Sequence, residues 1–449
     1  MVRLSGRRSL EIAASVLKTP APVGQLRPGR EYVVWVVDPA TGRDVDQAVF
    51  TIRRAPRSYT GEDMAEIHVH GGRAVAARVL GLLTDSGARP AQAGEFTMRA
   101  FANGRMDLAR AEAVAQIVAA DSRSQLECAS RVLSGEFSSK LEQLYAALVD
   151  LLSAIEARIE FPEDDVPETR PDDLARRLDG VRLDVSALAA TFREGRMIAQ
   201  GARVVIAGRP NAGKSSLFNA LSGGDRAIVT EIPGTTRDPI EAVLDWDGLP
   251  VRLFDTAGLR RSGDRIEMLG LERAERHLED ADAVIYVIDR SLPADPEDAE
   301  NLSRFAEHCV VALNKSDLPP ATGNWRLATA DSGVQPPASR LPPPAFTLRC
   351  SALTGDGVPE IRRSVMGLLV AGPAAAGDAL VITNARHYAL LREAETALRQ
   401  TVDALHASAT EDLVAGDVTA ALRALGQITG KDVSADVLSE IFSKFCIGK

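Results

Sequence analysis

Cysteine is scarce in this sequence, and the few that occur stand far apart. The chain has 449 residues and four cysteines, Cys128, Cys309, Cys350 and Cys446, with no Cys-x-x-Cys pair. This spacing argues against a disulfide framework or a cysteine-bound zinc site, and it fits a reducing, cytoplasmic location. No signal peptide or apolar run of membrane length occurs, so no membrane partner is expected.

Aromatic residues and excess positive charge are also lacking. Aromatics make up 4% of the chain, so its cores must depend on Leu, Val, Ile and Ala, within an ordinary hydrophobic content of 45%. The net charge of −10 argues against a permanent electrostatic attraction to nucleic acid, and any RNA contact would need a local patch or a partner. The length predicts about three domains.

One stretch, residues 208–215, has the pattern Gly, four residues, then Gly-Lys-Ser. An apolar, mostly β-branched run precedes it at residues 204–207, and a helical pattern follows at residues 216–221. A loop in this context presents backbone N–H groups and a helix N-terminus to phosphate oxygens. Lys214 is expected to reach the β- and γ-phosphates, and Ser215 to ligate Mg²⁺.

Four later segments predict which nucleotide binds. Thr236, in the segment Gly234-Thr235-Thr236, can complete the Mg²⁺ shell, and Asp255 can hold the metal through water. Asp317 ends an Asn-Lys-x-Asp segment and can accept two N–H donors from guanine, whereas adenine offers the wrong pattern. With the phosphate loop these make five segments in the right order, each at an expected strand end, and together they predict a translation-factor-type GTPase. The expected GTP contacts are Asn211, Ala212, Gly213, Lys214, Ser215, Ser216, Thr230, Glu231, Ile232, Pro233, Gly234, Thr235, Thr236, Asp255, Thr256, Ala257, Gly258, Asn314, Lys315, Asp317, Ser351, Ala352 and Leu353.

The periodicity of the remaining chain predicts a multidomain protein. We expect an α+β domain over residues 1–103, helices over 104–200, an α/β P-loop domain over 201–365, and helices again over 366–449. An apolar stripe from Leu141 to Ile159 predicts one long helix, and Ser434 is expected to cap the last one. Residues 319–344 are rich in proline and are interpreted as a surface loop, with a proline-recognition site as the alternative.

Several further motifs carry a resemblance to a known family. They are Thr60-Gly61-Glu62-Asp63, His70-Gly71-Gly72, Gly94-Glu95-Phe96-Thr97, residues 107–113, the P-loop, residues 255–260, and the terminal Phe445-Cys446-Ile447-Gly448-Lys449. With these residues the sequence resembles the tRNA modification GTPase MnmE (TrmE) family over nearly its whole length. The resemblance implies a folate-binding, dimer-forming N-terminal domain and a discontinuous all-α helical domain into which the GTPase domain is inserted.

The resemblance also implies an activity and partners. The family acts as a homodimer with the FAD-dependent protein MnmG (GidA) to form a carboxymethylaminomethyl or aminomethyl group on carbon 5 of the wobble uridine of certain tRNAs. A reduced folate supplies the one-carbon unit; the matching residues are Arg3, Glu66, Arg105 and Lys449, with Cys446 as a candidate for that chemistry. Two departures stand out. The family usually has a strand and a glycine-rich turn before Arg-x-Ser-Gly, whereas this sequence starts at Met1-Val2-Arg3-Leu4-Ser5-Gly6, so part of the folate pocket or dimer edge is expected to be missing or to come from elsewhere. The family often has Lys where this chain has Arg105, which keeps the charge but changes the geometry.

Hydrolysis by such a site needs an unusual explanation, because Leu259 stands where many GTPases have a water-orienting Gln. The resemblance implies that K⁺ takes the place of an arginine finger when two GTPase domains pair. The matching catalytic positions are Asn211, Glu267 and Arg260, and the K⁺ ligands would be Asn211, Thr230, Ile232 and Thr235. Without the resemblance, Glu267 would be interpreted as a solvated glutamate on a helix. The resemblance implies instead that it is the acid that orients or activates water.

Two other functions stay open on the sequence. A ribosome-assembly GTPase would need a basic RNA-binding module with a Gly-x-x-Gly loop, which the acidic charge and helical C-terminus disfavour. A nucleotide-regulated scaffold without essential hydrolysis would keep the same phosphate and metal residues. Turnover with and without K⁺ separates these cases.

Overall fold

A computed structural model describes residues 1–160, 171–223, 241–255, 277–293, 295–305, 308–321, 346–369, 380–407 and 410–445. These residues form two compact units. The first contains residues 1–119, 129–181 and 393–449, and the second contains residues 120–128 and 182–392. Three helices, α5 (Arg123–Ser134), α7 (Pro171–Ala190) and α13 (Ala385–His406), contribute residues to both units.

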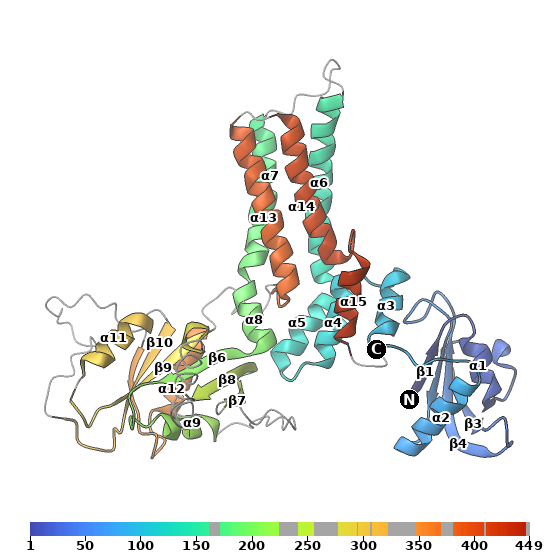
Figure 1. The fold of residues 1–449 in the computed structure, drawn as a ribbon, viewed down its shortest axis with the longest axis horizontal. Coiled ribbons are helices and arrows are strands. Elements are labelled where there is room, and N and C mark those ends of the chain that lie inside the picture. Colours follow the sequence, from blue (N-terminus) through green and yellow to red (C-terminus); the bar gives the residue numbers. More distant parts are fainter. Residues whose placement is uncertain are drawn as a thin grey trace, which may run out of the picture. The chain divides into compact units, whose positions relative to one another are not determined.

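The first unit begins with a five-stranded antiparallel sheet (Figure 1). Its strand order is β1 (Val2–Ser5), β5 (Met64–His68), β4 (Asp44–Arg53), β3 (Glu31–Val37) and β2 (Leu17–Lys18). Helices α1 (Ser9–Ser15) and α2 (Arg73–Asp85) and the short turn η1 (Val23–Gln25) pack on one face. In β3, Val34 and Val36 are buried while Val33 and Trp35 are 68% and 44% exposed. The two-residue period therefore gives the sheet one packed face and one accessible face.

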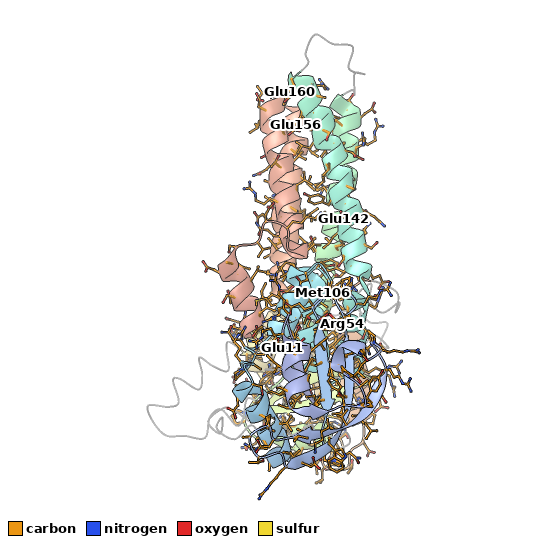
Figure 2. All side chains as sticks on the ribbon, turned by 90° about the vertical axis from the view of Figure 1, so that its right-hand side faces the viewer. Glu11, Arg54, Met106, Glu142, Glu156 and Glu160 are labelled. Carbon is orange, nitrogen blue, oxygen red and sulfur yellow. The ribbon has the colours of Figure 1, made fainter. Side chains whose placement is uncertain are left out.

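Helices make up the rest of this unit: α3 (Glu95–Ala102), α4 (Leu108–Val118), α6 (Glu136–Glu160), α14 (Glu411–Thr429) and α15 (Ala435–Ser443). The predicted long helix is confirmed as α6, which packs along α14; its apolar stripe is buried from Leu141 to Ile155, whereas Ile159 is exposed. Glu142, Glu156 and Glu160 mark the length of α6 in Figure 2. Glu142 pairs with Lys431 at 3.2 Å, and Ser434 caps α15 as expected, accepting from the Val437 N–H.

The second unit is built on a six-stranded sheet with the order β11-β10-β9-β6-β8-β7. Five strands are parallel, namely β6 (Ala202–Ala207), β8 (Leu249–Asp255), β9 (Ala283–Asp289), β10 (Cys309–Asn314) and β11 (Phe346–Arg349), and β7 (Glu241–Trp246) pairs antiparallel to β8. Helices α9 (Lys214–Ser222) and α12 (Val358–Leu369) pack in one hydrophobic core and α11 (Pro296–Phe305) in another. This is the expected P-loop architecture, and its parallel strands end at one edge.

Helices α7 and α8 (Phe192–Gln200) are separated at Thr191. The Thr191 hydroxyl donates to the Leu188 carbonyl at 2.7 Å and accepts from the Ile382 N–H at 3.1 Å, so local hydrogen bonding competes with the helix there. No helix in the described ranges is long and apolar enough to span a bilayer.

Candidate functional site

The loop between β6 and α9 can be formed only with glycine at two positions. Gly208 has φ +137°, and a Cβ there would lie 2.2 Å from the Val287 carbonyl oxygen. Gly213 has φ +98°, and its Cβ would lie 2.1 Å from Nδ2 of Asn314. Any side chain would push the loop off the neighbouring strand ends, so the glycines fix how closely the loop packs on the sheet.

The lysine and serine that follow the loop are held by nearby oxygens. Lys214 is 7% exposed, and its Nζ donates to the carbonyls of Gly208 and Arg209 at 2.8 and 2.7 Å. Ser215 Oγ donates to Asp255 Oδ2 at 2.7 Å. The structure therefore brings together the hydroxyl and the carboxylate expected at the metal site, and both are the hard oxygen donors that Mg²⁺ prefers.

Asn314, at the end of β10, connects the phosphate loop to the segment after β11. Its Nδ2 donates to the Ala212 carbonyl at 2.9 Å, and its Oδ1 accepts from the Ala352 N–H at 2.9 Å. The side chain is 2% exposed, and the Cys350 thiol lies 3.8 Å from the same Oδ1. One buried amide thus spaces the two loops that are expected to contact the phosphate and base ends of a nucleotide.

The predicted base-contacting segments lie side by side. Ser351 Oγ donates to Asp317 Oδ1 at 2.6 Å, which orients an exposed carboxylate. Leu353 is 85% exposed, as an apolar support for a planar base would be. Lys315 pairs with the buried Asp289. Burial alone would raise the pKa of Asp289, but hydrogen bonds from Lys315 and Ser291 outweigh it and leave the pKa below its usual value.

A second candidate site lies on the N-terminal sheet. A cavity of about 420 Å³ is lined by Arg53, Arg57, Ser58, Tyr59, Met64, Glu66 and Arg105. Arg3 Nε donates to Glu66 Oε1 at 2.8 Å across β1 and β5. Three of the four residues expected to bind folate, Arg3, Glu66 and Arg105, are therefore brought to this part of the sheet, and Lys449 lies outside the described residues.

Comparisons with known proteins cover both sites. The MnmE helical domain model matches residues 108–446, and the model of the GTP-binding protein TrmE N-terminus matches residues 1–105. The tRNA modification GTPase MnmE of Moorella thermoacetica is 41% identical over 454 residues, with 100% of this chain and 96% of the relative covered. That of Thermus thermophilus is 42% identical over 449 residues, with 100% of this chain and 95% of the relative covered.

The chain belongs to the MnmE (TrmE) family. It is a GTPase, and the MnmE family's activity implies GTP and Mg²⁺ as its ligands.

Many of the residues matched to MnmE by resemblance fall outside the described ranges. These are Thr230, Glu231, Ile232, Pro233, Gly234, Thr235, Thr236, Thr256, Ala257, Gly258, Arg260, Glu267, Cys446 and Lys449, together with Leu259 and most of the proline-rich segment. Asn211 is described; it has φ +63° and is exposed in the phosphate loop. The MnmE roles of these residues stay predictions.

Sequence reasoning missed the partners of Arg209 in the same loop. Its guanidinium lies 2.8 Å from Asp295 Oδ2 and 3.1 Å from Asp298 Oδ2, and Tyr286 donates its hydroxyl to Asp298 Oδ1 at 3.1 Å. Burial, foremost, raises the pKa of Tyr286, with the neighbouring Asp298 adding to it. No motif marks these acids, because they lie more than 80 residues from Arg209 and only the sheet brings them together.

Proposed function

We propose that this MnmE-family protein binds GTP with Mg²⁺ and couples its hydrolysis to the modification of tRNA. The observation that carries this proposal is the Asn314 side chain, which bonds to the phosphate loop on one side and to the Ser351–Leu353 segment on the other. A nucleotide between these loops would meet Lys214 at its phosphates and Asp317 at its base. The MnmE name of the relatives supplies tRNA as the substrate.

Within this function the individual residues have distinct tasks. Lys214 would exchange its two carbonyl acceptors for β- and γ-phosphate oxygens, so that its charge is never left buried and unpaired. Ser215, Asp255 and Thr236 would hold Mg²⁺, which neutralises charge that develops on the phosphates. Asp317, oriented by Ser351, would accept the two N–H donors of guanine.

For hydrolysis we propose a K⁺-activated site completed by pairing of two GTPase domains. Asn211 supports this, because it is an exposed residue in the phosphate loop, with a left-handed backbone conformation and a side chain that carries an amide oxygen. Thr230, Ile232 and Thr235 would complete the ion's shell, Glu267 would orient or activate water in place of the amide that Leu259 lacks, and Arg260 would make a weaker switch contact. Glu267→Ala should lower turnover roughly a hundredfold without abolishing pairing.

The N-terminal cavity is proposed as the site of a reduced folate. Glu66 contributes a carboxylate beside a cavity of about 420 Å³, and such a carboxylate matches the two donors at the amino-oxo edge of a pterin. Arg3 holds the Glu66 carboxylate in place through its hydrogen bond to Oε1, and Arg105 adds a guanidinium to the lining of the cavity. Lys449 and Cys446 would join from the C-terminus. The folate would supply the one-carbon unit in a homodimer working with MnmG in the cytoplasm.

The deciding experiment is reconstitution with the flavoprotein partner, a reduced folate and unmodified tRNA. Mass spectrometry of nucleosides should reveal the carboxymethylaminomethyl or aminomethyl group on the wobble uridine only when GTP is hydrolysed, and Lys214→Ala should abolish it. GTP turnover without any change in tRNA nucleosides would favour a ribosome-assembly role. Modification that proceeds fully with a non-hydrolysable GTP analogue would favour the scaffold.

A further inference from the structure

The arginines of the N-terminal cavity differ in how their charge is satisfied. Arg105 Nε donates to the Ser58 carbonyl at 3.1 Å, and nearby Arg54 pairs with Asp63 at 2.9 Å. Arg53 and Arg57 line the cavity and are exposed. Within the part of the chain that the structure describes, neither forms an ion pair or a side-chain hydrogen bond. Their donors are therefore available to a ligand.

Both arginines project from well-anchored backbone. Arg53 is the last residue of β4 and lies opposite Met64 in the register with β5. Arg57 opens a loop whose next residues are tied down. Ser58 Oγ donates to the Glu62 carbonyl, Tyr59 Oη lies 2.9 Å from Thr97 Oγ1, and Asn103 Nδ2 donates to the Thr60 carbonyl at 2.7 Å. A fixed loop loses little conformational entropy when it binds.

The two ends of the cavity have opposite chemistry. Met64 and Glu66 are two residues apart on β5, so they share a face of the sheet, and their Cα atoms are about 7 Å apart along the strand. Arg53 lies beside Met64, whereas the Glu66 carboxylate already pairs with Arg3. The lining thus offers an acceptor at one end and the uncompensated charge of Arg53 towards the other, and Arg57 adds a second uncompensated charge to the lining. Two separate guanidinium groups suit a ligand with two separate carboxylates.

The geometry points to Arg53 and Arg57 as the subsite for the α- and γ-carboxylates of the folate's glutamate tail, with the pterin directed towards Glu66. This assignment rests on the proposed folate function of the cavity and extends it to two residues outside the family's matched positions. It makes the glutamate tail, and not only the pterin, a determinant of binding.

The test is calorimetric titration of the full-length protein with two ligands: 5-formyltetrahydrofolate and 5-formyltetrahydropteroate, which lacks the glutamate. The unmodified protein should bind the tailed ligand roughly tenfold or more tightly, as charge-assisted hydrogen bonds allow. Arg53→Gln and Arg57→Gln should each lower the affinity for 5-formyltetrahydrofolate roughly fivefold to tenfold. Neither change should alter the affinity for 5-formyltetrahydropteroate. Arg57→Lys should recover part of the loss, because it restores charge but not the bidentate fork.

Arg43→Gln is the matched control, since it removes one exposed charge from the turn before β4, at the opposite end of that strand from Arg53. It should leave both affinities unchanged. Equal binding of the two ligands by the unmodified protein, or equal losses for both in the Gln variants, would overturn the tail subsite and leave the folate function standing. Failure of both ligands to bind any variant would remove the folate function and the subsite with it. Loss of tRNA affinity with an unchanged tail preference would instead assign the arginines to RNA phosphates.

Discussion

The two candidate sites satisfy their polar groups in different ways. In the nucleotide region, Lys214, Ser215, Asn314 and Asp317 are bonded to backbone or to one another, and two of them are almost fully buried. In the N-terminal cavity, Arg53 and Arg57 are exposed and have no internal partner among the described residues. A buried polar group must be paired, so the first site is part of the fold itself, whereas the second is a ligand surface placed on a fold.

This difference predicts that the same kind of substitution has different consequences in the two regions. Changes at the buried residues of the nucleotide loops should disturb binding and packing together. Changes in the cavity should disturb binding alone, since exposed charges without partners contribute little to stability.

The substitution expected to have the largest effect, and so to test this comparison most strongly, is Asn314→Ala. The change leaves the Ala212 carbonyl and the Ala352 N–H without their buried partner and lets the two loops move apart. GTP affinity should fall roughly a thousandfold, and the free energy of unfolding of the GTPase domain should fall by about 2 kcal/mol. Fluorescent-nucleotide titration and calorimetric melting measure the two effects.

Asn219→Ala on the exposed side of α9 is the control, and it should change neither value appreciably. If Asn314→Ala bound GTP normally but melted early, the amide would be a packing residue with no part in the site.

The comparison also explains how far the sequence alone could predict each site. The phosphate loop demands Gly208 and Gly213 at fixed spacing from Lys214, and such demands on the backbone leave a linear motif. The later nucleotide-binding segments could also be predicted at strand ends, because the strands before them have a recognisable apolar pattern. The backbone conformation does not require arginine at positions 53 and 57. The proposed role of Arg53 and Arg57 depends on β4, β5 and a loop that come together only in the folded structure, so no local sequence motif marks these residues. The Arg209 pairs with Asp295 and Asp298 escaped for the same reason.

A second test, with a smaller expected effect, concerns the selection of guanine by Asp317. Asp317→Asn can no longer accept both N–H donors of guanine, because an amide has one acceptor atom and one donor group. GTP affinity should fall roughly a hundredfold and xanthosine triphosphate should become the preferred nucleotide, while the stability stays nearly unchanged because Asp317 is exposed. Competition binding with the two nucleotides tests this, and an unaltered GTP affinity would sink the assignment of Asp317.

Asn211 allows a change within the nucleotide loop that should leave the packed network intact. Its side chain is exposed, and Lys214 and the loop amides remain when it is replaced. Hydrolysis by the unmodified protein should be roughly thirtyfold faster in K⁺ than in Na⁺, because the smaller ion bridges carbonyls and phosphates less well. Asn211→Ala should flatten that ratio and leave GTP binding mostly unaltered. Equal rates of the unmodified protein in the two salts would remove the ion from the mechanism.

The N-terminal unit also contains a packed ionic network around Glu95. This network allows a paired, buried charge to be compared, within the same unit, with the exposed arginines of the cavity that have no partner among the described residues. Glu95 is 5% exposed and accepts from Arg89, Arg99 and the Gln92 N–H. The hydrogen bond from Arg89, foremost, lowers the pKa of Glu95 to about 2 from its ordinary value of 4.5, and burial opposes the shift.

Because the folded pKa is depressed, Glu95 stabilises the unit fully above about pH 4.5 and loses that contribution as the pH falls towards 2. Glu95→Gln should cost about 1 kcal/mol at pH 7, after allowance for solvent screening, and should make unfolding less sensitive to acid between pH 4.5 and 2. Arg57→Gln should leave that acid profile unchanged. Hydrogen exchange of peptides from residues 1–105, corrected for the intrinsic pH dependence of exchange, measures both. An acid profile that shifts as much in Arg57→Gln as in Glu95→Gln would mean that the cavity arginines support the fold, and the distinction between a packed site and an open one would fail in this unit.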